Sequence, residues 1–91
     1  MSEAAMNPLP SDTDRSAEFD ALVREAIERV APDVDAIAIP ADADFREEAE
    51  LDSMDFLGVL AVVHDRTGVE IPETDYGRIT TIDEFVEYLL G

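Results

Sequence analysis

Hydrophobic side chains recur at the spacing of an α-helix in three stretches of the chain. The first covers residues 16–30, with Ser16 as the candidate N-cap, and it ends at Pro32 because proline cannot continue a helix. The second covers about residues 53–66 and ends before Gly68, since glycine is favoured just past the end of a helix. The pattern predicts a helix in each stretch.

The third periodic stretch lies at the end of the sequence. It follows Thr80 and Thr81, either of which can cap a helix. Its apolar stripe consists of Ile82, Phe85, Val86, Leu89 and Leu90. Before it, residues 69–72 are expected to be extended, and residues 73–78 are expected to form a single helical turn. The elements together predict an all-α fold with three main helices and one short helix.

The segment between the first two predicted helices, residues 33–52, is long for a loop in a compact domain. Five apolar side chains are expected to pin it across the core: Val34, Ile37, Ile39, Phe45 and Leu51. Residues 1–15 contain prolines and polar residues without periodicity, so we expect a flexible leader there. The folded domain is expected to cover residues 16–91.

The second predicted helix is apolar on more sides than a small core needs. At about 100° per residue, one face serves the core with Phe56, Leu57, Val59, Leu60 and Val63. The other side, next to Ser53, carries Met54, Asp55, Gly58, Ala61, Val62 and Asp65. A smooth, lightly charged side is expected where another protein docks. The alternative is a central helix that the preceding loop buries on most sides.

Composition narrows the possible functions. With 91 residues, 46% of them hydrophobic, the chain forms at most one small folded domain. A net charge of -17 argues against binding to nucleic acid or anionic membranes. It indicates a basic partner, or else a well-solvated surface or an adaptation to salt. The absence of cysteine excludes disulfides and thiol nucleophiles. Without a long apolar run or a signal peptide, we expect a cytoplasmic protein that does not insert into membranes.

The sequence lacks the pattern of a catalytic or metal site. Ser53 and the single histidine, His64, are eleven residues apart on one predicted helix, which separates them by about 16 Å along its axis. They therefore cannot act as nucleophile and base, and a self-contained hydrolase is disfavoured. An EF-hand loop counted from Asp42 would place Arg46 at a ligand position and Ser53 where a bidentate glutamate is needed. No catalytic residue and no metal ligand is predicted.

Ser53 has another possible role, as an acceptor of a phosphodiester. At the first residue of a helix, free backbone N–H groups and the positive end of the helix dipole stabilise a phosphate. A serine at a helix start is also a common N-cap. Its position alone leaves both roles open.

The stretch LDSMDFLGVLAVVHDRTGVEIPETDYGRITTIDEFVEYL resembles the acyl carrier proteins and related phosphopantetheine-binding carrier domains. Residues 52–54, Asp-Ser-Met, are similar to the family's Asp-Ser-Leu attachment motif, and residues 70–72 and 79–82 resemble the segments that close the second helix and open the last. Phe45 matches the aromatic residue that pins the long loop. The resemblance covers about residues 19–90 and implies a four-helix bundle with a short third helix.

The resemblance also implies a function. A 4'-phosphopantetheine arm on Ser53 would carry acyl or aminoacyl groups as thioesters, so the protein would be a carrier and not an enzyme. The implied partners are a phosphopantetheinyl transferase, which would recognise Asp52 and Asp55, a loading ligase, and downstream acyl-processing enzymes with basic docking surfaces. We expect a monomer. A different hypothesis is an unmodified interaction module that docks through the outer side of the second helix.

The chain departs from the family pattern at several positions. Glu50 replaces a frequent glycine, and Gly58 together with residues 64–66, His-Asp-Arg, stands where fatty-acid carriers tend to have glutamates. These departures favour a specialised stand-alone carrier for aminoacyl, short acyl or polyketide-type cargo. The Asp-Ser-Met form also resembles D-alanyl carriers. Bulky residues of the second helix predict less internal space for a long acyl chain than in a fatty-acid carrier.

Overall fold

The computed structural model describes residues 12–91, and side chains from Asp14 onward. Its helical elements are α1 (Asp12–Val30), the 3-10 helix η2 (Ala36–Ala38), α2 (Phe45–Glu48), α3 (Ser53–Thr67), the 3-10 helix η3 (Glu73–Arg78) and α4 (Ile82–Leu90). The described residues contain no strand, only an isolated bridge between Asp44 and Thr81. The predicted all-α bundle with a short helix before the last one is confirmed. None of the described helices is long and apolar enough to cross a membrane.

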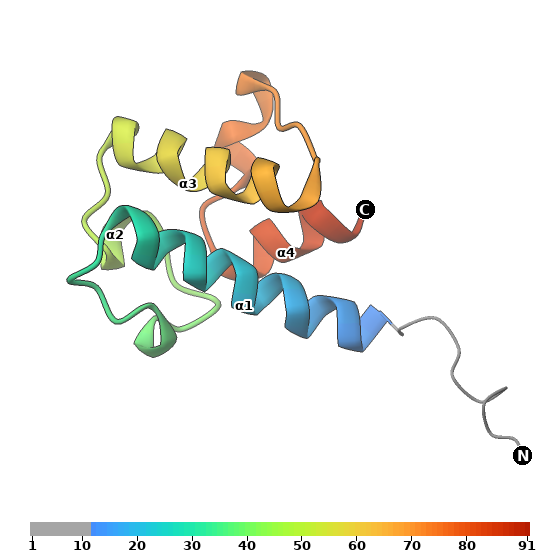
Figure 1. Cartoon of the computed structure of the whole chain (residues 1–91), viewed down its shortest axis with the longest axis horizontal. Coiled ribbons are helices and arrows are strands. Elements are labelled where there is room, and N and C mark those ends of the chain that lie inside the picture. Colours follow the sequence, from blue (N-terminus) through green and yellow to red (C-terminus); the bar gives the residue numbers. More distant parts are fainter. Residues whose placement is uncertain (1–11) are drawn as a thin grey trace, which may run out of the picture.

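Helix α1 is the element against which the other long helices pack. It contacts both α3 and α4, which lie beside it in Figure 1. The helix already includes Asp12, so Ser16 lies inside it and the predicted N-cap at Ser16 is wrong. Residues 1–11 lie outside the described part of the chain. The boundary between a leader and the folded domain stays a prediction.

The core consists of apolar side chains from every long helix and from the connections. Its largest fully buried members are Phe45, Phe85, Ile27, Ile79, Ile82, Val23, Val59 and Val63. No buried polar or charged residue interrupts the core of the described chain. Burial of these side chains supplies the main driving force for folding.

The connection between α1 and α3 is more ordered than a simple loop, because it contains η2 and α2. The Arg24 side chain of α1 donates hydrogen bonds to the carbonyl oxygens of Ala36 and Ile39, each at 2.7 Å. Of the predicted pins, Ile39 and Phe45 are buried. The prediction for Ile37 is wrong, since 79% of that residue is exposed. The other two, Val34 and Leu51, pack against the core while partly exposed.

The caps of α3 and α4 follow the sequence signals. Gly68 ends α3 with φ of 75°, and its N–H donates to the His64 carbonyl oxygen. Thr81 caps α4 and exchanges hydrogen bonds with Glu84 in a capping box. Hydrogen bonds from Thr80, then from Thr81, hold the pKa of the Glu84 carboxyl below its ordinary value. These caps confirm the predicted end of the second helix and the start of the last.

The start of α2 is tied to the start of α4 by backbone hydrogen bonds. The Phe45 N–H donates to the Thr80 carbonyl oxygen at 3.1 Å, and the Asp83 N–H donates to the Ala41 carbonyl oxygen at 3.0 Å. The segment that leads to α3 is therefore fixed against the opposite end of the chain.

Candidate functional site

Ser53 is the first residue of α3, and the preceding Asp52 is its N-cap. The Asp52 carboxylate accepts a hydrogen bond from the Asp55 N–H at 2.8 Å, and the Asp55 carboxylate accepts one from the Asp52 N–H at 3.4 Å. This capping box satisfies N–H groups that would otherwise lack partners at the helix start. The cap role that the sequence left open for Ser53 thus belongs to Asp52.

The Ser53 side chain is exposed, and its hydroxyl has no hydrogen-bond partner among the described residues. His64 lies on the same helix, where its Nδ1 is 3.1 Å from the Val69 carbonyl oxygen. It is therefore engaged near the far end of α3, consistent with the separation expected from the sequence. The described residues also contain no cluster of three or more side chains able to hold a metal ion.

Clear pKa shifts in the described chain fall on α4. Besides Glu84, the pKa of the Tyr88 hydroxyl is raised, mainly because it donates a hydrogen bond of 2.6 Å to the Asp75 carboxylate. The Tyr88 hydrogen bond joins α4 to η3, whereas Glu84 belongs to the N-terminal cap of α4. They do not provide a base for Ser53.

The backbone conformation of Glu50 sets the direction in which the chain enters α3. Helix α2 ends in a Schellman motif, in which the Leu51 N–H donates to the Arg46 carbonyl oxygen at 2.8 Å and the Glu50 N–H donates to the Glu47 carbonyl oxygen at 3.1 Å. Glu50 occupies the left-handed position of this motif, with φ of 53°. It is the position at which the resemblance expected glycine. A left-handed backbone conformation is costly for a residue with a Cβ atom.

Replacing Glu50 by glycine should therefore stabilise the protein. We expect the free energy of unfolding to rise by about 0.5–1 kcal/mol, because relief of the left-handed strain exceeds the entropic cost of glycine. Urea unfolding followed by circular dichroism measures this change. The matched control is Glu48→Gly inside α2, which should lower the free energy of unfolding. A loss of stability in Glu50→Gly would contradict the strain at this position.

The faces of α3 differ from the helical wheel at one position. Phe56, Val59, Leu60 and Val63 are buried as predicted. Leu57 was predicted to serve the core, but it is 44% exposed, so this prediction is wrong. The open face of the helix is correspondingly more apolar. It carries Ser53, Met54, Leu57, Ala61, His64 and Asp65.

Two residues predicted for the outer side, Gly58 and Val62, lie instead on the side of α3 that packs within the bundle. A Cβ atom at Gly58 would be 3.1 Å from Cγ2 of Val30, so glycine allows α1 and α3 to approach closely. Val62 is partly buried against the core. Asp52 is exposed, and Asp55 is partly exposed.

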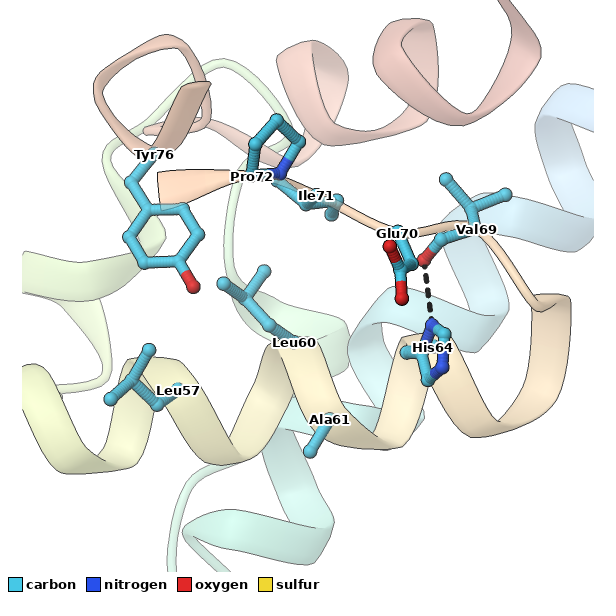
Figure 2. A pocket seen from close by; sticks show the side chains of 9 residues that line it. All are labelled: Leu57, Leu60, Ala61, His64, Val69, Glu70, Ile71, Pro72 and Tyr76. Carbon is cyan, nitrogen blue, oxygen red and sulfur yellow. Dashed lines mark hydrogen bonds between the residues drawn. The ribbon is translucent and has the colours of Figure 1, made fainter. Parts of the chain in front are cut away.

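An open groove of about 660 Å³ runs beside the exposed face of α3 (Figure 2). Side chains of α3 form one wall, and residues 69–72 with Tyr76 form the other. The Leu57 and Leu60 side chains point from α3 into the groove, and the Tyr76 ring points toward them from the opposite wall. Sequence reasoning missed Tyr76. Its only signal was an aromatic residue in an otherwise polar helical turn.

Residues 21–89 match the protein family described as phosphopantetheine attachment site. This chain belongs to the family of acyl carrier, phosphopantetheine-binding proteins. Proteins of this family are non-catalytic carriers that interact with modifying and acyl-processing enzymes. The carrier's cofactor is accordingly a covalently attached 4'-phosphopantetheine.

Acyl carrier proteins from several bacteria are similar to this carrier. The protein from Rubrobacter xylanophilus is 35% identical over 57 residues, which are 63% of this chain and 70% of the relative. The protein from Lactobacillus johnsonii is 34% identical over 56 residues, 62% of this chain and 70% of the relative. The protein from Helicobacter pylori is 29% identical over 56 residues, 62% of this chain and 72% of the relative.

The start of α3 fits such a cofactor in this carrier. The Ser53 hydroxyl is exposed, and the first N–H groups of a 15-residue helix, together with its dipole, favour a phosphodiester. The Asp52 and Asp55 carboxylates accept the hydrogen bonds of the capping box. 4'-Phosphopantetheine ends in a thiol, a group that this chain, which has no cysteine, otherwise lacks.

Proposed function

We propose that this protein is a specialised stand-alone carrier whose 4'-phosphopantetheine arm is attached to Ser53. The supporting observation is the exposed Ser53 hydroxyl at the first residue of α3, free of the cap role that Asp52 performs. The serine thus has no structural task in the described chain that would compete with modification. The arm presents acyl or aminoacyl groups to separate enzymes.

The proposed partners are a phosphopantetheinyl transferase, a loading ligase and downstream acyl-processing enzymes. They approach the open side of α3, where the recognition residues are Asp52, Met54, Asp55, Ala61 and Asp65. Gly58 and Val62 contribute from behind this surface, since they set the packing of α3 within the bundle. The net charge of -17 favours partners with basic docking surfaces and disfavours nucleic acid. We expect a cytoplasmic monomer.

The specialised role is inferred from the charge at the far end of α3. His64 and Arg66 are exposed there, and Arg66 forms an ion pair with Glu25 of α1 at 2.8 Å. Fatty-acid carriers tend to have glutamates in this region. A partner that recognises a run of negative charge would therefore bind this protein less tightly. Aminoacyl, short acyl, polyketide-type and D-alanyl groups are the proposed range of cargo.

The attachment is tested by measuring the intact mass after incubation with coenzyme A and a broad-specificity phosphopantetheinyl transferase. We expect a gain of one phosphopantetheine. Trypsin cleaves after arginine and releases residues 47–66, in which Ser53 is the only residue with a hydroxyl group. The added mass should remain on this peptide. Incubation without coenzyme A is the control.

Absence of a mass gain, under conditions that modify an established carrier protein, would contradict the proposal. The observations would then favour the unmodified interaction module, which uses the same open side of α3 to dock a partner. A mass gain on a peptide other than residues 47–66 would contradict the assignment to Ser53.

A further inference from the structure

The interior of the bundle is occupied by a row of aromatic rings. The Phe45 ring lies at the centre, with its centroid 6.1 Å from that of Phe85 and 6.3 Å from that of Phe56. The row continues to Tyr76, whose ring meets the Phe56 ring edge-on at 5.6 Å. Phe45 and Phe85 are completely buried, and Phe56 is 2% exposed. Rings at these separations pack favourably with one another.

Phe56 is the member of this row that lies on the same helix as the attachment residue. It follows Ser53 by one helical turn on α3, and its ring is contacted from several directions. The Arg46 guanidinium of α2 lies over the ring, 4.0 Å from its centroid, in a cation–π contact. Phe45 and Tyr76 cover other parts of the same ring. A chain that entered the bundle below Ser53 would have to displace these contacts.

Tyr76 stands between the interior and the open groove. Its ring packs on Phe56 and also lines the groove beside α3, opposite Leu57 and Leu60 (Figure 2). The groove is apolar near Tyr76, but His64 and Glu70 lie toward its other end. Cargo kept out of the interior therefore meets a shallow surface with polar groups.

We propose that Phe56 and Tyr76 exclude cargo from the bundle interior, so that this carrier transports short or polar acyl groups. The inference rests on the proposed carrier function. Exposed aliphatic surface is unfavourable in water, and an interior filled with rings gives a long aliphatic chain no place to be buried. A short or polar acyl group does not need that burial. The two rings are thus specificity-determining residues.

The test uses Ser53→Cys, the single cysteine in a chain that otherwise has none. Its thiolate displaces iodide from N-decyl or N-methyl iodoacetamide, which attaches a long or a short chain without any transferase. The methyl resonances of buried Val59, Ile79 and Ile82 then report entry into the core. We expect the decyl and methyl adducts to show the same core resonances and the same melting temperature.

The double substitution Phe56→Ala and Tyr76→Ala in the same background removes the proposed barrier. There the decyl adduct should shift the core resonances and melt at a higher temperature than the methyl adduct. Tyr88→Ala, which truncates a tyrosine outside the row, should behave like the parent. Should the double variant fail to fold, the parent protein and the single variants Phe56→Leu and Tyr76→Leu decide the question.

Core shifts caused by the decyl chain in the parent would overturn the proposal. Equal resonances for both adducts in a folded double variant would also overturn it, because the rings would then not be the barrier. Chemical attachment keeps this outcome separate from the proposed function. A failure of enzymatic modification at Ser53 would refute the carrier assignment while leaving the measurement of the interior intact.

Discussion

Replacing Ser53 by alanine is expected to abolish the mass gain from coenzyme A and transferase completely, while the protein stays folded. The attachment needs the hydroxyl oxygen, which alanine lacks. The fold does not need it, because the side chain is exposed and Asp52 supplies the helix cap. Alanine is also a good helix former. The free energy of unfolding should therefore change by no more than about 0.5 kcal/mol.

Intact mass spectrometry and urea unfolding, performed on the same preparation, separate the two effects. The matched control is Ser16→Ala, a serine inside α1, which should retain the full mass gain. If Ser53→Ala were both unmodified and unfolded, the missing mass gain could result from unfolding. That result would show that the serine has a structural role. A modified Ser53→Ala would place the attachment at another residue.

The sequence predicted the parts of the fold that rest on local chemistry. Gly68 was identified as a helix end, and Thr80 or Thr81 as a helix start, because a left-handed C-cap and a capping box depend on neighbouring residues only. The start of α1 was misplaced by four residues, from Asp12 to Ser16. The first apolar residue that marks the period is Phe19, and residues 12–15 carry no apolar side chain. The apolar pattern therefore gave no sign of the first turn of α1.

The helix α2 was missed because four residues are too short to show a period. A signal was present, since Asp44 precedes the helix and its carboxylate accepts from the Arg46 and Glu47 N–H groups. The left-handed backbone of Glu50 had no signal in its own residue type. The expected glycine at that position was the only indication.

At the candidate site, the sequence indicated which residues lie near Ser53 better than which side chains of α3 are exposed. Ser53, Asp52 and Asp55 lie together because they are adjacent on one helix start, which the sequence fixes locally. The orientation of Leu57 and Gly58 depends on where α1 and the segment of residues 69–72 pack, and a helical wheel contains no such information. The contact between Phe56 and Tyr76 joins residues far apart in the chain. It becomes visible only in the folded protein.

Phe45→Ala is expected to have the largest effect on stability in this chain. Truncating a fully buried phenylalanine removes its burial and leaves a cavity, which costs about 3–5 kcal/mol. Domains of this size have a total stability of only about 5–15 kcal/mol. The Phe45 side chain also holds α2 in place, because its ring contacts Phe56 and Phe85. The substitution should therefore remove a large share of the free energy of unfolding.

Urea unfolding measures the loss, with Phe19→Ala as the matched control. Phe19 lies on α1 and is only partly buried, so its truncation removes less burial and leaves a smaller cavity. The two losses should therefore differ clearly, by about 2 kcal/mol. Equal losses would show that the aromatic row does not organise the core. The prediction also concerns the candidate site, because α2 and the left-handed Glu50 directly precede the segment that carries Ser53. Where the Phe45→Ala variant is still folded, enzymatic attachment at Ser53 should be slower than in the parent.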